Sequence, residues 1–377
     1  MIQEIKRKLI SNYVNWRGWS TNKKIVVIES DDWGSVRVPS KEAIEKLIQV
    51  GADVRDNYFL KFDCLESNTD LEALFELLSK YKDQNGNHPS ITANTLLFNP
   101  DFKKIKNEGK QQYYDEPIET TYKRYPNHDN VLKMWLNEGI PNNFLFPQFH
   151  AREHINPRFY MQAINSGNKI EDTAFDLEIV YGFRHKDNYL VKTYMATNWH
   201  ENEEHKKIIH DAAVQGLDKF QSLFGFRSIS FAACCSIQSD DLNEIMYKNG
   251  VEINQLGQFF EPQSNGTLRK VDRFWGDKNS AGQRYWRRNV VFEPSRNQKQ
   301  DWTDTVMQQI ETAFRWGKPA VINSHRVNFS GGIETQNRDL TLKHLDSILK
   351  AICKKYPEVL FLNSAQLAEE LLADLKK

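Results

Sequence analysis

The chain has 377 residues, of which 40% are hydrophobic and 12% aromatic, and its 50 basic side chains balance its 50 acidic ones. This composition is typical of a folded globular protein, and a net charge of zero gives no electrostatic reason to expect a nucleic-acid partner. No window reaches the roughly 18 to 20 apolar residues of a transmembrane helix, and no apolar secretion signal begins the chain, so we expect a cytoplasmic location.

The N-terminal segment 1–22 predicts a basic amphipathic helix, because Lys and Arg alternate with apolar residues at helical spacing. We expect this helix to pack on the domain, and a weak contact with a membrane surface or a partner is the alternative. The remaining residues, 23–377, predict one domain with loop insertions at about 103–127 and 257–300.

The run Ile-Val-Val-Ile-Glu-Ser-Asp-Asp-Trp-Gly at 25–34 is the most informative stretch of the chain. Four aliphatic residues predict a strand buried on both faces, as in a parallel sheet covered by helices. Asp31 and Asp32 end this strand, where α/β proteins carry their sites. Crowded carboxylates need a cation, a shared proton or solvent. An acidic turn that caps the next helix is the other interpretation.

Strands and helices alternate along the rest of the chain, which predicts an α/β fold with a mostly parallel sheet. Further strands are expected at 90–94, 144–149, 228–235, 320–324 and 359–364. Helices are expected at 40–51, 69–81, 128–139, 202–224, 240–250, 302–316, 337–355 and 365–375. The polar segment 103–127 is expected to be irregular, and the aromatic, basic stretch 257–295 is expected to bind sugar or to pack.

Two histidines, His150 and His154, follow the third predicted strand. On a helical turn, a spacing of four places both imidazoles on one face, where they can hold one metal ion. A surface pair is the alternative. With one carboxylate they would make a divalent site that keeps open positions for water and substrate. The four cysteines, at 64, 234, 235 and 353, include no zinc-knuckle pair and predict reduced, buried thiols without a clear function.

These motifs together resemble the polysaccharide deacetylase superfamily, also called the NodB-homology or carbohydrate esterase four family. The sequence Ser-Asp-Asp-Trp-Gly at 30–34 resembles the first motif of that family, and His150 and His154 match its two metal-binding histidines. Asp301 and the following Trp partly resemble the fourth motif, and Asn-Ser-His at 323–325 occupies the place of the fifth. The resemblance implies a distorted, incomplete (β/α) barrel.

The same resemblance implies the roles of individual residues. Asp32, His150 and His154 would bind one divalent ion, most simply zinc, with cobalt, nickel or manganese as alternatives. Asp31 would be the catalytic base and His325 the general acid, so an acetylated carbohydrate would be deacetylated by an activated water. The residues expected to bind the sugar or support the site are Trp33, Arg326, Asn328 and Asp301.

The third motif departs from the family pattern. Its Phe-Arg-Pro-Pro appears here as Phe-Ala-Ala-Cys at 231–234, without the Arg that supports the base. We expect Arg152 or Arg326 to replace it from a neighbouring loop. Two other functions stay open: a metal-free glycoside hydrolase that uses Asp31 and Glu293 as acid and base, and a non-catalytic carbohydrate-binding protein with a degenerate site.

Overall fold

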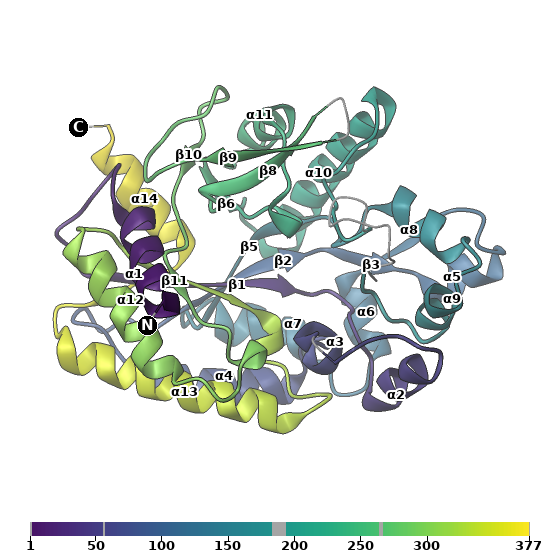
Figure 1. Cartoon of the computed structure of the whole chain (residues 1–377), viewed down its shortest axis with the longest axis horizontal. Coiled ribbons are helices and arrows are strands. Elements are labelled where there is room, and N and C mark those ends of the chain that lie inside the picture. Colours follow the sequence, from purple (N-terminus) through teal and green to yellow (C-terminus); the bar gives the residue numbers. More distant parts are fainter. Residues whose placement is uncertain (1, 56, 183–193, 264–266, 377) are drawn as a thin grey trace.

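A parallel sheet forms the centre of the molecule (Figure 1). The structure is a computed structural model that describes residues 2–55, 57–182, 194–263 and 267–376. The main sheet has nine strands in the order β10-β7-β6-β5-β2-β1-β12-β11, and β13 pairs in parallel with the first residues of β1. The strands are β1 (Ile25–Trp33), β2 (Ile91–Leu96), β5 (Leu145–Ala151), β6 (Ser230–Phe231), β7 (Ile253–Asn254), β10 (Arg284–Tyr285), β11 (Val290–Val291), β12 (Ala320–His325) and β13 (Leu360–Phe361).

All the pairs of this sheet are parallel, and in the described chain its path ends at β10 and at β11 without closing. The predicted α/β fold, an incomplete (β/α) barrel, is therefore confirmed. β1 lies between β2 and β12 in the middle of the sheet, so the loops after these strands meet at one edge. This edge carries the acids at the end of β1.

Helices connect the strands and bury the outer face of the sheet. Val26 and Ile28 of β1 pack in one large core with apolar residues of α4, α10, α12 and α13. The inner face is closed at its base by another cluster, in which Ile25 and Val27 meet α14 and Trp286. The predicted helices are observed as α2 (Lys41–Gln49), α4 (Asn68–Ser79), α7 (Val131–Met134), α10 (Glu203–Phe224), α11 (Asp240–Lys248), α12 (Trp302–Arg315), α13 (Thr335–Lys355) and α14 (Ser364–Asp374).

Three short helices were not expected from the sequence: α3 (Tyr58–Phe62), α8 (Pro157–Ile164) and α9 (Lys169–Asp176). The expectation of an irregular segment at 103–127 is wrong. It contains most of α5 (Phe102–Asn107), together with β4 (Asp115–Pro117) and α6 (Ile118–Arg124), and β4 pairs with β3 (Phe98–Pro100). The reason is that Ile118 and Tyr122 are buried in the main core, which orders this polar segment.

The expected insertion at 257–300 is also structured, apart from 264–266, which lie outside the described residues. It begins with an antiparallel hairpin of β8 (Gln258–Pro262) and β9 (Leu268–Asp272). It then supplies β10 and β11, the two end strands of the main sheet.

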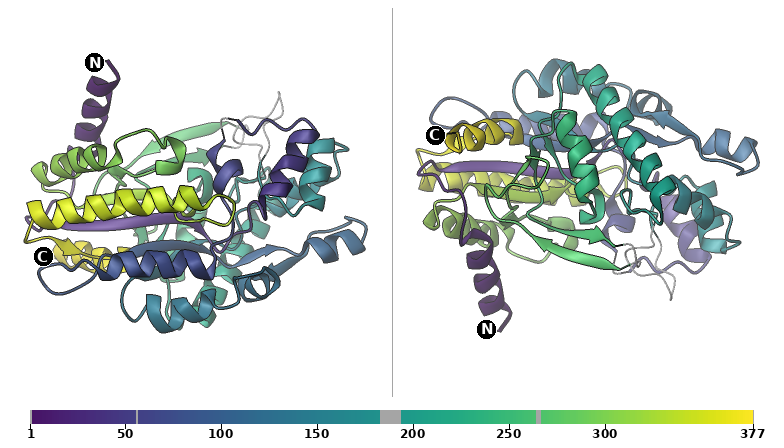
Figure 2. Two further views of the ribbon diagram at one scale, coloured as in Figure 1. Left: turned by 90° about the horizontal axis from the view of Figure 1, so that it is seen from below. Right: turned by 90° about the horizontal axis from the view of Figure 1, so that it is seen from above.

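The first helix, α1 (Ile2–Asn15), projects from the body of the molecule (Figure 2). Its last turns make the contacts with the rest of the chain. Asn15 is buried and accepts a hydrogen bond of 2.7 Å from Asn289, and Trp316 donates one of 2.9 Å to Asn12. Within the part of the chain that the structure describes, no helix combines the length and the apolar character needed to cross a membrane.

Candidate metal and catalytic site

Asp31 and Asp32 reach the same cleft because β1 is irregular where they occur. On a regular strand, neighbouring side chains point to opposite faces. Between Ser30 and Trp33 the pairing of β1 with β2 shifts register, and Asp32 has a left-handed backbone with a φ of 76°. Both acids consequently line one cleft, while Trp33 turns into the core. Such a backbone costs about 1–3 kcal/mol and is typical of functional sites.

The two histidines come from the end of β5 and not from a helix. His150 belongs to β5 and points into the cleft, whereas its neighbours Phe149 and Ala151 pack elsewhere in apolar clusters. His154 lies in the turn that leads to α8. The prediction of a shared helical turn is wrong, because the strand end followed by a tight turn brings the imidazoles together instead.

Asp32 faces two kinds of partner with its two carboxylate oxygens. Oδ1 lies 3.4 Å from Nε2 of His150 and 3.1 Å from Nε2 of His154, while Oδ2 lies 3.0 Å from a guanidinium nitrogen of Arg37. Two ligands of one tetrahedral zinc ion, each about 2.0–2.1 Å from it, lie about 3.3 Å apart. Asp32 is therefore at a ligand's spacing from each imidazole, although it lies outside the group that the two histidines form with Cys234. Burial alone would raise the pKa of Asp32, but Arg37 and the imidazoles hold it well below its usual range.

The hydrogen bonds of the imidazoles also fit a metal ion. His150 donates its Nδ1 proton to the carbonyl of Ala232 at 2.6 Å, so in the neutral imidazole Nε2 carries a lone pair. A bare Nε2 that faces a carboxylate oxygen is unfavourable unless a proton or a cation lies between them. Nδ1 of His154 is buried and has no hydrogen-bond partner among the described residues. The residues present thus fit a divalent ion.

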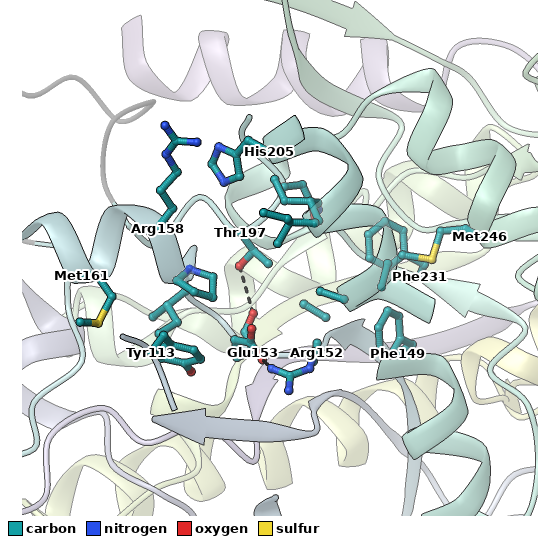
Figure 3. Close-up of a pocket in the computed structure, with 18 residues that line it drawn as sticks. Tyr113, Phe149, Arg152, Glu153, Arg158, Met161, Thr197, His205, Phe231 and Met246 are labelled. Atoms are coloured by element: carbon teal, nitrogen blue, oxygen red, sulfur yellow. Dashed lines mark hydrogen bonds and ion pairs between the residues drawn. The ribbon is translucent and has the colours of Figure 1, made fainter. Parts of the chain in front are cut away.

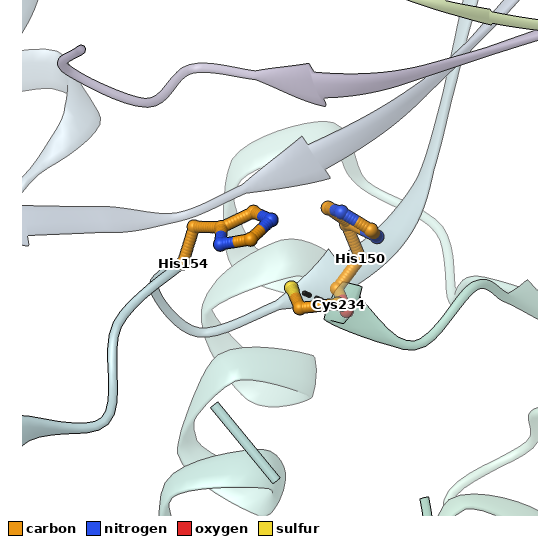
Figure 4. Close-up of side chains that lie close together, drawn as sticks. All are labelled: His150, His154 and Cys234. Atoms are coloured by element: carbon orange, nitrogen blue, oxygen red, sulfur yellow. Dashed lines mark hydrogen bonds between the residues drawn. The ribbon is translucent and has the colours of Figure 1, made fainter. Parts of the chain in front are cut away.

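A thiol completes this group. The ligating atoms of His150, His154 and Cys234 lie within 4.8 Å of one another, and all three side chains are buried (Figure 4). Burial alone would raise the pKa of the Cys234 thiol, but the facing imidazoles outweigh this effect and lower that pKa to about 6. The three residues form a buried group that can hold a metal ion.

Asp31 is held by an arginine from the far end of the chain. Arg288 contacts both carboxylate oxygens of Asp31, at 2.7 and 2.9 Å, and its Nε lies 2.6 Å from Glu29. Asn94 donates a further hydrogen bond of 2.7 Å to Asp31. Burial would raise the pKa of Asp31, but Arg288 holds it well below the ordinary value. Asp31 is therefore an oriented, ionised carboxylate.

The two arginines expected to support Asp31 are engaged elsewhere. Arg326 is fully buried and pairs with Asp63 at 2.9 Å and with Glu66 at 3.1 Å. Arg152 forms ion pairs with Asp115 and Glu153, and it lines a separate, mostly apolar cavity of about 290 Å³ behind β5 (Figure 3). Both expectations are wrong, because Arg288 occupies the position beside Asp31.

His325 lies on the other side of Asp31. Its Nε2 is 4.0 Å from Asp31, and its Nδ1 donates to Glu293 at 2.5 Å. Asn328 donates a hydrogen bond of 2.6 Å to the other carboxylate oxygen of Glu293 and so fixes it. Burial opposes a charged imidazole, but the Glu293 carboxylate outweighs burial and raises the pKa of His325 to about 9. His325 is consequently protonated at neutral pH, as a general acid requires.

Three residues expected to bind sugar do not reach the cleft. Trp33 is 1% exposed and stacks on Phe329 in the core. Asn328 is buried and orients Glu293. Asp301 is the N-cap of α12, where it accepts a hydrogen bond from the backbone of Asp304. Arg326, already described, is inaccessible as well.

Asp31, Asp32, His150, His154 and His325 line one cleft of about 770 Å³. Arg37, Arg288 and the relation of Cys234 to the histidines were not predicted from the sequence. Glu293 was predicted only as one of the two carboxylates of a glycoside hydrolase. The cysteine at the end of the third motif could have indicated that Cys234 lies near the histidines. Nothing in the sequence distinguishes Arg288 from the other basic residues around it.

No protein-family model matches the chain. No curated protein matches it either. Among solved structures it is similar to a provisionally named polysaccharide deacetylase from Mycobacterium smegmatis, with 10% identity, 95% of this chain and 93% of that chain covered, and a TM-score of 0.43. It is also similar to the allantoinase PuuE, with 10% identity, coverage of 94% and 92%, and a TM-score of 0.43.

A provisionally named glycoside hydrolase/deacetylase from Parabacteroides distasonis gives 8% identity, coverage of 95% and 73%, and a TM-score of 0.46. Polysaccharide deacetylases are thus among the structural neighbours, as the sequence motifs led us to expect.

Proposed function

We propose that the protein is a metal-dependent carbohydrate deacetylase, which hydrolyses an N-acetyl or O-acetyl group of a glycan or glycan precursor. One observation carries this proposal. A carboxylate held by Arg288 and an imidazole held by Glu293 flank the group of Asp32, His150 and His154 in a single cleft. A base, an acid and a metal-binding group are the three components that such a hydrolysis needs.

When bound, a divalent ion would supply Lewis acidity toward the acetyl carbonyl and lower the pKa of a bound water. Asp31, ionised and oriented by Arg288, accepts a proton from the attacking water. His325 presents its Nε2 proton to the departing nitrogen or oxygen while Glu293 stabilises the imidazolium. The acyl C–N or C–O bond breaks, and acetate and the free amine or hydroxyl are released. We propose zinc as the ion.

The contacts disfavour the two other functions. A glycoside hydrolase would use Asp31 and Glu293 directly on the sugar, but both oxygens of Glu293 are engaged, by His325 and by Asn328. A degenerate binding protein was suggested by the missing Arg of the third motif. Arg288 makes the bidentate contact that this Arg would provide, which favours a working base.

Metal analysis combined with an acetate-release screen on acetylated sugars tests the proposal. The wild type is expected to contain about one divalent ion per chain and to release acetate. Asp31→Asn should keep the ion and lose about 10²- to 10⁴-fold in rate, and the double variant His150→Ala, His154→Ala should lose both. Full activity in Asp31→Asn, or no metal in reloaded wild type, would refute the proposal.

We also propose that α1 contacts an anionic membrane surface beside the cleft. Three large apolar side chains of this helix, at Leu9, Ile10 and Tyr13, and that of Trp16 directly after it are between 46% and 66% exposed. Within the helix, three basic residues at positions 6–8 outnumber the single acidic residue in an otherwise balanced chain. Ile10 and Tyr13 also line the cleft. An amphipathic, basic helix of this kind suits the interface of an anionic bilayer.

Sedimentation with vesicles tests this contact. The wild type is expected to sediment with vesicles that contain phosphatidylserine and to stay in solution with pure phosphatidylcholine, whereas Leu9→Glu, Ile10→Glu should stay in solution with both. Equal behaviour of wild type and variant would refute it, and concentration-dependent dimers lost in the variant would assign the face to a second copy.

We propose the cytoplasm as the compartment. The free thiols of the four cysteines suit a reducing compartment, and cell fractionation tests this proposal.

A further inference from the structure

Core packing alone does not explain the position of Cys234. It is fully buried, and its Sγ lies beside the two imidazoles that face Asp32 (Figure 4). Its hydrogen bond to the carbonyl of His150 is long at 3.9 Å, and it also interacts with the imidazoles of His150 and His154. In the described part of the chain, the group it forms with His150 and His154 is the one cluster of three or more such side chains close enough to share an ion.

The backbone after Cys234 is strained. Cys235 and Ser236 both have left-handed backbones, with φ of 53° and 55°. Each such residue costs about 1 kcal/mol or more and persists where the surroundings require it. The turn places Cys234 against the histidines, whereas the side chain of Cys235 turns away and contacts the carbonyl of Met195 at 3.3 Å. Only the first thiol of the pair joins the histidines.

We propose that Cys234 binds the metal ion as a thiolate together with His150 and His154, on which Asp32 closes from the cleft side, and thereby makes the site selective for zinc or cobalt over manganese. This inference rests on the proposed metal site and deepens it. A thiolate is a soft ligand that suits zinc and cobalt, whereas manganese prefers oxygen ligands. The thiolate and the Asp32 carboxylate together neutralise a divalent ion in a buried place. The three protein ligands His150, His154 and Cys234 leave the fourth position of a tetrahedral zinc ion for water.

The same arrangement explains the departure from the third motif. The stretch Phe-Ala-Ala-Cys at 231–234 lacks the usual Arg, and Arg288 contacts Asp31 in its place. The segment that follows β6 therefore does not need to support Asp31. It contributes to the metal group twice, through the carbonyl of Ala232, which fixes His150, and through the sulfur of Cys234.

Cobalt substitution tests the inference, because a thiolate bound to Co²⁺ produces a near-ultraviolet charge-transfer band that imidazole and carboxylate ligands do not produce. Metal-free wild type titrated with Co²⁺ is expected to show this band together with the visible cobalt bands. Cys234→Ser should keep visible bands and lose the charge-transfer band. Cys353→Ser, which removes a partly exposed thiol from α13, should match the wild type.

Competition with a chromophoric chelator measures selectivity in the same variants. Cys234→Ser is expected to weaken zinc binding by at least about tenfold and manganese binding much less. Visible cobalt bands in wild type without the charge-transfer band would overturn the role of Cys234 and leave the metal site standing. No cobalt binding to wild type would overturn both. Since the wild-type spectrum alone decides this, a variant that fails to fold does not remove the test.

Discussion

The neighbouring acids Asp31 and Asp32 of β1 lie in two halves of the cleft, and different residues surround each of them. Asp32 faces His150 and His154, and these two histidines form a group with Cys234. The strands that precede the three residues, β5 and β6, lie on the same side of β1. Asp31 faces Arg288, which is 257 residues away in sequence and lies just before β11 on the other side. Identical side chains thus acquire different chemistry from their partners, one beside a metal-binding group and one beside a fixed cation.

Replacing Arg288 by a neutral residue is expected to have the largest effect, and it tests whether the two halves of the cleft are separate. In Arg288→Met, both Glu29 and Asp31 lose a buried partner, which should cost about 3–5 kcal/mol of unfolding free energy. The pKa of Asp31 should rise, and kcat/KM should fall by at least about 100-fold. Metal content should stay unchanged, because the Asp32 half is separate. Urea unfolding, kinetics and elemental analysis measure the three quantities.

The matched control is Arg269→Met, which removes an exposed arginine paired with Glu261 on the hairpin. It should change neither unfolding nor metal content. If Arg288→Met loses its metal while staying folded, the two halves are one coupled unit and the comparison fails.

A moderate effect is expected at the acid. Because Glu293 raises the pKa of His325 to about 9, activity should be full below that pH and fall as pH rises through about 9. Glu293→Gln removes the stabilising charge, so the alkaline fall should move to lower pH, as a pH profile of kcat/KM would measure. An unmoved alkaline limb in this variant, with Glu261→Gln as the control, would exclude His325 as the titrating acid.

The smallest effect is expected outside both halves. Asp301 caps α12 and does not line the cleft, so Asp301→Ala should lower the unfolding free energy by about 1 kcal/mol. Its kcat/KM and metal content should equal those of the wild type in assays well below the unfolding temperature. A large loss of activity in this folded variant would show that Asp301 has a role in the site.

The placement of Asp32, His150 and His154 could be predicted from sequence because its signals are local, whereas the parts played by Arg37 and Cys234 could not. Acids at the end of an apolar strand and two histidines four residues apart sit where a parallel sheet brings its strand ends together. The alternation of strands and helices likewise predicted an α/β fold with a parallel sheet, and the family resemblance implied the open barrel. The error about a helical turn arose because a spacing of four does not distinguish a helix from a strand end followed by a turn.

The Asp31 half could not be predicted from sequence, because its partners depend on tertiary folding. Arg288 lies among other basic residues, and only the approach of β11 to β12 places it beside β1. The burial of Trp33 depends on a register shift that the pattern of apolar and polar residues does not reveal. The ion pairs of Arg326 with Asp63 and Glu66 show the same limit, because charged residues in the sequence do not reveal which of them are buried.

The place of β1 in the sheet has a consequence for how the protein is made. Among the described strands, β1 is synthesised first although it is a central one, and its neighbour β12 starts only at Ala320. Until then, one edge of β1 lacks its partner, and Glu29 and Asp31 lack the guanidinium that balances them. The segment between β1 and β12 must therefore be synthesised before the sheet can form, and during that time an unpaired strand edge favours aggregation.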